Sequence, residues 1–184
     1  MTEATDDVVR VRPYRGGEED VALEAIRESL VELGPFMPWA HPEIARKDIE
    51  EWIEHATTSC EAGTAFEYVI EDASTGRFLG GVGLNSFDKT NRRANLGYWV
   101  RSSETGRGVG SRSAALMAQL GLTVFGFCRV EIFAAVSNVG SIAVMESIGA
   151  RREGILRNRL QLPGGVSDAV MYSLIDPSEI VFRS

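Results

Sequence analysis

Residues 105–110 form a glycine-rich segment whose residue types suit the binding of phosphate. The segment reads Thr-Gly-Arg-Gly-Val-Gly and lies between an apolar strand pattern at residues 97–100 and a helical pattern that begins near Gly108. Glycine lets backbone N–H groups approach a ligand closely, and the first N–H groups of a helix have no partner within it. Together with the positive end of the helix dipole, these groups predict a cradle for a phosphate.

Two common nucleotide-binding patterns do not fit this segment. A Walker loop requires Gly-Lys followed by Ser or Thr, and the chain has no such sequence. A dinucleotide fold requires G-x-G-x-x-G and an acidic residue that ends the next strand. Here the spacing is G-x-G-x-G, and Glu131 lies near the start of its strand. A nucleotide-binding module is therefore disfavoured.

The elements that must position this segment are predicted from hydrophobic periodicity and from Gly and Pro residues at turns. They indicate one mixed α/β domain over residues 1–184, in the order βααβββαβαββ. Gly80, Gly81 and Gly83 within one strand indicate a bulge or a closely approaching ligand. The expected strands are residues 8–13, 67–71, 78–85, 93–100, 129–136, 151–161 and 166–175, and the expected helices are residues 18–33, 43–61, 108–125 and 138–148.

An aromatic loop at residues 35–42 separates the first two helices. It contains Trp39 and His41 and is stiffened by three prolines. Exposed aromatic loops often line binding sites, and a lid over the core is the equally weighted alternative. The second helix places Trp52 on its inner face, and Asn138 is expected to cap the last helix.

Composition and charge narrow the classes of function. The 184 residues are 44% hydrophobic, which is enough for one domain with a sizeable core. The net charge of −7 argues against a general nucleic-acid-binding protein, because such proteins present a basic face. The same charge is compatible with cationic partners such as amines or basic proteins.

The cysteines and the apolar runs predict where the protein resides. The two cysteines, Cys60 and Cys128, match no metal-binding spacing, and Cys128 is expected to be a buried thiol. A reducing compartment is the simple interpretation. The N-terminal residues are acidic and polar, and no apolar run approaches the ~18 residues of a membrane span. We therefore expect a soluble, cytoplasmic protein without membrane contact and without a metal.

The glycine segment and the strand before it resemble the acetyl-CoA motif of the GNAT acetyltransferases. That motif is Val or Ile, four residues, Gln or Arg, two residues, Gly, one residue, and Gly or Ala. This chain has Val100, Thr105, Gly108 and Gly110 at those positions. Thr105 replaces the usual Gln or Arg, which is expected to cost little because the family uses mainly the backbone N–H there.

Further stretches are similar to the RimJ/RimL-like branch, the ribosomal-protein N-terminal acetyltransferase type. Ala150 stands where the branch usually has Phe, which affects local packing only. The resemblance implies the GNAT fold, a mixed and mostly antiparallel sheet flanked by helices and splayed at the acetyl-CoA site. Dimers occur in this branch, so a homodimer is an open alternative. The similar stretches follow in order over nearly the whole chain: residues 36–39, 95–100, 138–141, 144–150, 152–157 and 170–174.

The resemblance also implies how acetyl-CoA is bound. Backbone N–H groups of residues 106–111 would hold its pyrophosphate, and Asn138 would bond the pantetheine arm. A backbone N–H near Trp99 or Val100 would face the thioester oxygen, while the side chains of Tyr98 and Trp99 are expected to belong to the core. The implied cofactor-binding residues are Trp99, Val100, Gly106, Arg107, Gly108, Val109, Gly110, Ser111, Asn138 and Ser141.

Two catalytic roles are expected on the same basis. Many GNAT enzymes place a Tyr four residues after Ser141 to protonate the thiolate, but this chain has Met145 there. RimL-like enzymes also lack that Tyr and have a serine near the sulfur. Ser141 is therefore expected to donate the proton, directly or through water, with a second capping residue as the alternative. An α-amino group with a pKa of ~8 needs only a modest base or a water relay. Glu67, on a strand that leads towards the centre, is the first candidate, and His41 in the aromatic loop is the second.

The acceptor is expected to be a primary amine bound beside Trp39, His41 and Trp52. A protein N-terminal α-amine of the ribosomal type is the first candidate. A small cationic amine such as a polyamine, an aminoglycoside or an aminoacyl nucleotide is the second. A non-catalytic module that binds acyl-CoA on the same fold is the alternative from a different class.

Overall fold

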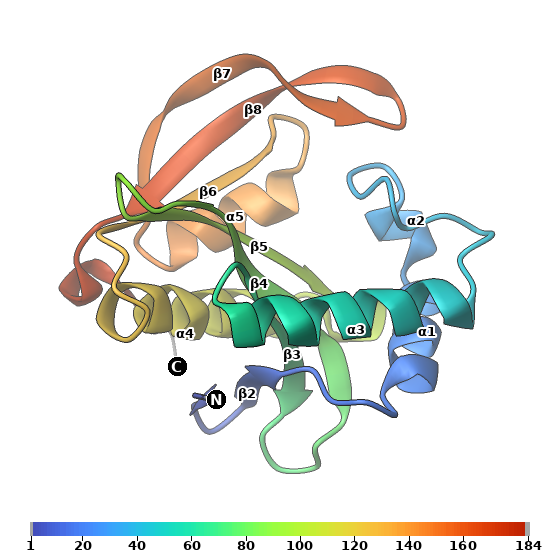
Figure 1. Cartoon of the computed structure of the whole chain (residues 1–184). Helices are drawn as coiled ribbons and strands as arrows, with labels where there is room; N and C mark the ends of the chain where they lie inside the picture. The colour runs from blue at the N-terminus through green and yellow to red at the C-terminus, as the bar shows by residue number, and fades with distance from the viewer. Residues whose placement is uncertain (1, 183–184) are drawn as a thin grey trace.

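An eight-stranded mixed sheet runs through the molecule (Figure 1). The computed structural model describes residues 2–182; residues 1, 183 and 184 of the predicted domain lie outside the described residues. The strands are β1 (Ala4–Thr5), β2 (Val9–Pro13), β3 (Phe66–Asp72), β4 (Phe78–Asp88), β5 (Arg93–Val100), β6 (Arg129–Ala135), β7 (Arg151–Leu162) and β8 (Gly165–Leu174). They lie side by side in the order β1-β2-β3-β4-β5-β6-β8-β7, and among the described pairs only β5 and β6 are parallel.

Helices cover the two faces of the sheet. The helical elements are α1 (Glu19–Glu28), α2 (Leu30–Leu33), α3 (Arg46–Ala62), η1 (Ser102–Glu104), α4 (Val109–Thr123), α5 (Val139–Ser147) and η2 (Pro177–Glu179). Helices α4 and α5 pack on one face, whereas α1 and α3 pack on the other face over the N-terminal half of the sheet (Figure 1). The sheet and its two layers confirm the predicted mixed α/β fold with flanking helices.

The alternation of side chains along each strand supplies both helical layers with apolar partners. Val82, Leu84 and Leu96 are at most 2% exposed and pack in the core that contains α4. Val69 and Trp99 belong to the second core, between the sheet and helices α1 and α3. Burying one large aliphatic side chain stabilises the fold by roughly 1.5–3 kcal/mol, so these two cores determine which face each residue of β5 occupies.

The parallel pair β5 and β6 is in register only at one end. Its paired residues are Arg93 with Arg129, Ala94 with Val130 and Asn95 with Glu131. Both strands continue beyond these pairs, β5 to Val100 and β6 to Ala135. The sheet is therefore splayed beyond Asn95, as expected, and backbone groups of β5 there can pair with a ligand instead of a strand.

The predicted helix over residues 18–33 is two helices in the structure, separated at Ser29. The buried Ser29 Oγ donates to the carbonyl oxygen of Ala25 (2.7 Å) and accepts a hydrogen bond from the backbone N–H of Ser102 (2.9 Å). The helical period of the sequence continues across this point, so the break depends on a contact with a residue distant in the sequence. This contact ties α1 to the turn that follows β5.

The predicted helix over residues 43–61 begins three residues later, at Arg46. The Asp48 carboxylate accepts a hydrogen bond from the backbone N–H of Ala45 (2.8 Å), which sets the start of α3. Gly63, with a φ of +62°, terminates it. None of the helices formed by residues 2–182 is long and apolar enough to cross a membrane.

The prediction of a buried Cys128 is wrong. Cys128 is exposed and lies in the turn between α4 and β6, where its thiol is 3.3 Å from the carbonyl oxygen of Asn91. Its neighbour Phe127 is the residue that turns into the core, with 9% of its surface exposed. The apolar run around Cys128 therefore has a buried residue, but that residue is Phe127 and not the cysteine.

Candidate active site

The glycine loop leaves open space at the start of α4. Gly106 and Gly108 have left-handed backbones, with φ of +75° and +80°. A Cβ on Gly106 would meet nothing within 4 Å, and one on Gly108 would meet only Arg112 Nε, at 3.9 Å. Helix α4 begins at Val109 without a side-chain cap. Its first N–H groups can therefore bind an anion, and this geometry fits the predicted phosphate cradle.

A cavity of about 1060 Å³ extends from this loop to the end of β5 and the start of α5. The ten residues expected to bind the cofactor all line it. Residues from α2 and from the loop after it complete the wall, including Leu33, Phe36 and Met37. One elongated ligand can therefore touch the glycine loop, β5 and α5 together. The ten residues are Trp99, Val100, Gly106, Arg107, Gly108, Val109, Gly110, Ser111, Asn138 and Ser141.

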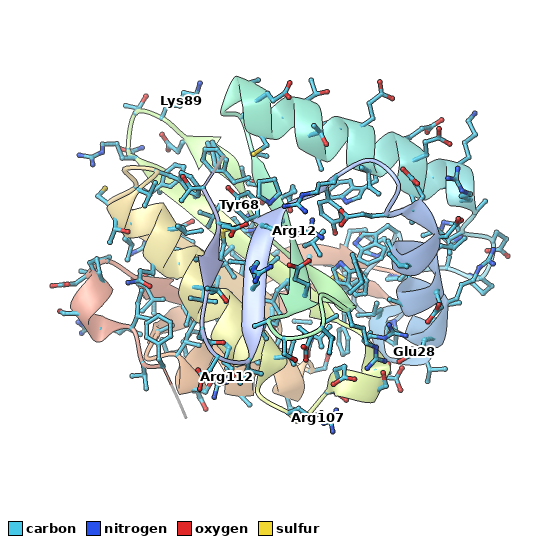
Figure 2. The ribbon with its side chains drawn as sticks, turned by 90° about the horizontal axis from the view of Figure 1, so that it is seen from below. Arg12, Glu28, Tyr68, Lys89, Arg107 and Arg112 are labelled. Carbon is cyan, nitrogen blue, oxygen red and sulfur yellow. The ribbon has the colours of Figure 1, made fainter. Side chains whose placement is uncertain are left out.

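Arginines surround the glycine loop and are held by carboxylates. Arg107 and Arg77 both donate to the buried Glu104, over 2.8 and 2.6 Å. The hydrogen bond from Arg107 is the main reason that the pKa of Glu104 is lowered. Arg112, in the first turns of α4, is paired with Asp6 over 2.8 Å. Arg107 and Arg112 lie toward the same edge of the molecule in Figure 2, and both line the cavity near the start of α4, together with Glu104.

A second cavity, of about 510 Å³, contains all the residues expected at the acceptor side. Trp39, His41, Trp52 and Glu67 line it, together with residues of α1, α3 and strands β3–β5. Trp39 and Trp52 are 40% and 42% exposed, so they form its rim and not the core. The aromatic loop is thus a wall of a cavity, one of its two predicted roles.

The two cavities meet at the end of β5. Met37, Tyr98 and Trp99 line both of them. The indole of Trp99 contacts Trp39 edge-on, with ring centroids 5.9 Å apart. A group bound along the glycine loop can therefore meet a group that enters beside Trp39, and the meeting point is where β5 leaves β6.

Glu67 places a carboxylate inside the second cavity. Its Oε1 accepts a hydrogen bond from Asn85 Nδ2 (3.0 Å), and Asn85 Oδ1 accepts another from Asn95 Nδ2 (3.0 Å). Burial raises the pKa of Glu67, while the hydrogen bond from Asn85 and the nearby His55 act in the opposite direction. A carboxylate with a raised pKa in a cavity is a candidate for proton transfer.

Glycines on β4 make room for the side chains of this site. Glu67 is registered with Gly83, and Gly83 with Gly97, so the row beside the carboxylate carries no side chains. A Cβ on Gly83 would lie 1.9 Å from Glu67 Oε2, and one on Gly81 would lie 2.7 Å from Trp99 Nε1. Of the two predicted alternatives, the bulge fits beside Gly80, where the register of β3 and β4 shifts between Ile70 and Glu71. At Gly81 and Gly83 the groups that approach closely are the chain's own indole and carboxylate.

Ser141 and Asn138 both lie where α5 begins. The Asn138 side chain accepts a hydrogen bond from the backbone N–H of Ser141 (3.0 Å), so it caps α5 as predicted. Ser141 Oγ is 2.8 Å from the hydroxyl oxygen of Tyr98. Met145, at the position where the GNAT resemblance led us to look for a Tyr, is fully buried. The serine hydroxyl is therefore the polar group that α5 presents toward β5.

Tyr98 has a polar contact that the sequence did not predict. Its expected place was the core, but its hydroxyl reaches Ser141, and the residue lines both cavities. Burial raises the pKa of Tyr98 to about 12, although the hydrogen bond with Ser141 lowers it. The only sequence signal was that Tyr, and not Phe, stands at a core position.

His41 is an exposed residue in the lining of the second cavity. Its Nδ1 is 3.3 Å from the Glu43 carboxylate, and 48% of its side chain is exposed. Glu67 is thus the more enclosed of the two candidate bases. His55, whose ring lies 5.9 Å from that of Trp52, is a neighbour of Glu67 that the sequence reasoning missed. Among residues 2–182, no three His, Cys, Asp or Glu side chains gather as a metal site.

Known proteins share both the sequence pattern and the fold. Residues 9–151 match the family described as Acetyltransferase (GNAT) domain. Over 100 residues, which are 54% of this chain and 55% of the relative, the chain is 35% identical to YdaF of Bacillus subtilis, provisionally named a ribosomal N-acetyltransferase.

Solved structures resemble the whole chain. Mycobacterium smegmatis RimJ, solved with a CoA disulfide, has a TM-score of 0.80 and 25% identity, covering 90% of this chain and 81% of RimJ. RimL, an α-N-acetyltransferase of ribosomal protein L7/L12 solved with coenzyme A, has a TM-score of 0.82 and 20% identity, covering 94% and 97%. At 20% identity the second likeness shows the fold alone. Because the family match spans well over half of the sequence, the chain belongs to the GNAT acetyltransferase family.

Proposed function

We propose that this protein transfers the acetyl group of acetyl-CoA to a protein N-terminal α-amine. The observation that carries the proposal is the meeting of the two cavities at Tyr98 and Trp99. One cavity has the open glycine loop of an anion site, and the other has the carboxylate of Glu67. RimL and RimJ, whose structures this chain resembles, were solved with coenzyme A or a CoA disulfide, and RimL acts on a protein α-amine.

The residues of the first cavity would hold acetyl-CoA along its length. The N–H groups at the start of α4, with Arg107 nearby, suit the pyrophosphate. The β5 backbone beyond Asn95 has no strand partner on the β6 side, so it suits the pantetheine amides and offers an N–H to the thioester oxygen. Bound acetyl-CoA would supply an activated acetyl thioester.

The residues of the second cavity would receive the amine and move its protons. Glu67 accepts a proton from the attacking amine, because a carboxylate inside the cavity is a base within its reach. Ser141 donates a proton to the departing thiolate from the other side of β5. Trp39 and Trp52 position the segment that follows the amine. Each group acts from the cavity that it lines: the base from the second cavity and the proton donor from the first.

An acceptor screen tests this function. We expect acetyl-CoA to be consumed with N-terminal peptides of ribosomal proteins, and mass spectrometry to find one acetyl group on the α-amine. Turnover only with polyamines, aminoglycosides or aminoacyl nucleotides would show that the acceptor is a small cationic amine and not a protein N-terminus. Tight binding of acetyl-CoA without turnover of any amine would favour a binding module. Tight binding of NAD or ATP, but not of acetyl-CoA, would contradict the proposal as a whole.

Ser141→Ala is expected to lower kcat by about 10²-fold, as for the loss of a proton donor. The affinity for acetyl-CoA should change little, because Ser141 is one residue among many that line the first cavity. Stopped-flow or steady-state kinetics with a peptide acceptor, together with calorimetric titration of CoA, measure the two effects separately. Wild-type turnover in this variant would assign the proton donor elsewhere.

Gly83→Ala is expected to lower kcat by about 10²-fold without weakening acetyl-CoA binding. The added Cβ would lie 1.9 Å from Glu67 Oε2, so the carboxylate must move from its place in the cavity. Gly154→Ala in strand β7 is the matched control, because a Cβ there would meet nothing within 4 Å. Equal kcat values for the two variants would show that catalysis does not depend on the position of the Glu67 carboxylate.

A further inference from the structure

We propose that Tyr98 is a positioning residue that turns the hydroxyl proton of Ser141 toward the reacting sulfur. This inference rests on the proposed function and deepens it. The phenol oxygen of Tyr98 lies 2.8 Å from Ser141 Oγ and 3.2 Å from the Ser141 carbonyl oxygen. The two residues come from β5 and α5, the elements that enclose the inner end of the first cavity.

The count of protons leaves two arrangements for this pair. The Tyr98 hydroxyl carries one proton, and the carbonyl oxygen of Ser141 can only accept. If Tyr98 donates to that carbonyl, the Ser141 hydroxyl can donate back to Tyr98 and is occupied. If Tyr98 donates to Ser141 Oγ, the Ser141 proton is free to meet a third atom. The 2.8 Å contact between the two hydroxyl oxygens is part of both arrangements, so the difference between them is whether a third atom takes the Ser141 proton.

The position of the pair identifies the third atom. Tyr98 lines both cavities, and Ser141 lines the first. The thioester must lie where the cavities meet, because its carbonyl carbon has to be within reach of an amine from the second cavity. The Ser141 hydroxyl is therefore beside the sulfur when acetyl-CoA is bound. The amide side of Ser141 is already engaged, since its N–H donates to Asn138 Oδ1.

Tyr98 is in the protonation state that a hydrogen-bond donor needs, and not in that of a base. Burial raises the pKa of Tyr98 to about 12, so its hydroxyl keeps its proton at neutral pH. When this neutral phenol donates to Ser141 Oγ, it strengthens the serine as a donor, since it supplies a hydrogen bond that the developing alkoxide would need.

The proposed step is balanced in protons and electrons. The bond between the amine nitrogen and the acetyl carbon forms, the carbon–sulfur bond breaks, and its electron pair stays on sulfur. Sulfur takes the Ser141 proton, Ser141 takes the Tyr98 proton, and water returns a proton to Tyr98. The proton lost by the amine passes to Glu67 and then to water, so no other reactant is needed.

Tyr98→Phe tests this role, because it removes one oxygen and keeps the buried ring. We expect kcat to fall by about tenfold, the effect of one hydrogen bond, with the KM for acetyl-CoA unchanged. Combined with Ser141→Ala, the variant should cause no further loss, because Tyr98 acts through Ser141. Tyr172→Phe is the control: its hydroxyl donates to Glu146 on the same helix α5, 2.9 Å away, and Tyr172 lines neither cavity.

A second measurement needs no acceptor. The thiol of CoA bound to the protein is alkylated by iodoacetamide over a range of pH, which gives its pKa. We expect that pKa to be lower in the wild type than in Tyr98→Phe or Ser141→Ala, because a hydrogen-bond donor stabilises the thiolate. Equal thiol pKa values in the wild type and Tyr98→Phe, or additive losses of kcat in the double variant, would overturn the inference. If the wild type acetylates no amine, the proposed function is refuted. The pKa of the bound CoA thiol would then still decide whether Tyr98 acts on the sulfur through Ser141.

Discussion

Gly108→Glu should abolish detectable binding of acetyl-CoA. The backbone at Gly108 has a φ of +80°, and the space above it is open to the cavity. A glutamate side chain would fill that space and place a negative charge where the pyrophosphate is expected, at the N-terminus of α4. The strain of a side chain in a left-handed conformation adds roughly 1–2 kcal/mol. Calorimetric titration with acetyl-CoA measures the loss of binding directly.

Gly126→Glu is the matched control for this change. Gly126 has a φ of +79°, a Cβ there would meet nothing within 4 Å, and the residue follows the other end of α4. Both variants therefore carry the same backbone strain and the same added charge, and only Gly108 lines the first cavity. Binding that is equally weak in both variants would attribute the effect to strain, and full binding in Gly108→Glu would refute the cradle.

Glu67→Gln should lower kcat/KM for a peptide acceptor by about 10³-fold at neutral pH, the middle of the range that one general base contributes. The amide cannot accept the proton of the amine. Acetyl-CoA affinity should not change, since Glu67 lines the second cavity and not the first. Glu54→Gln is the control, because Glu54 is exposed on α3 and lines neither cavity. A wild-type rate in Glu67→Gln would leave His41 or a water relay as the base.

The pH dependence of the wild type gives a second test of Glu67. Burial raises its pKa above the ordinary value of 4.5, and the base works only when ionised. As the pH falls, Glu67 is therefore protonated earlier than an exposed glutamate, and kcat/KM should decline with a midpoint above 4.5. A carboxyl group whose pKa is raised by folding stabilises the fold less as the pH rises, so Glu67→Gln should not lower Tm at neutral pH. A lower Tm would mean that the loss of activity reflects unfolding.

Local patterns were sufficient to predict the backbone that lines the donor half of the candidate site. The glycine loop, the strand before it and the start of α4 are consecutive in the sequence, so their geometry follows from turn and helix-start rules. For the same reason Asn138 could be predicted as the cap of α5, and its side chain accepts from Ser141 N–H. Local patterns could not assemble the acceptor half, because Trp39, Trp52 and Glu67 lie on three separate segments that only the tertiary structure brings together.

Register and side-chain contacts could not be read from the sequence. The row of Glu67, Gly83 and Gly97 depends on how β3, β4 and β5 are aligned, and a shift of one residue would turn each side chain to the other face. The break at Ser29 likewise depends on the N–H of Ser102, which is 73 residues away in the sequence.

By itself, the sequence determined the mixed α/β fold, the glycine loop and the family resemblance, because each is carried by short patterns of residue type and spacing. Only the tertiary structure decided that the expected separation of β5 and β6 begins beyond Asn95, that two cavities meet at that gap and that Tyr98 reaches Ser141. The physical reason is that strand alternation assigns Tyr98 only to a face of the sheet. Which group its hydroxyl meets depends on the helix packed there, and that helix begins about forty residues further along the chain.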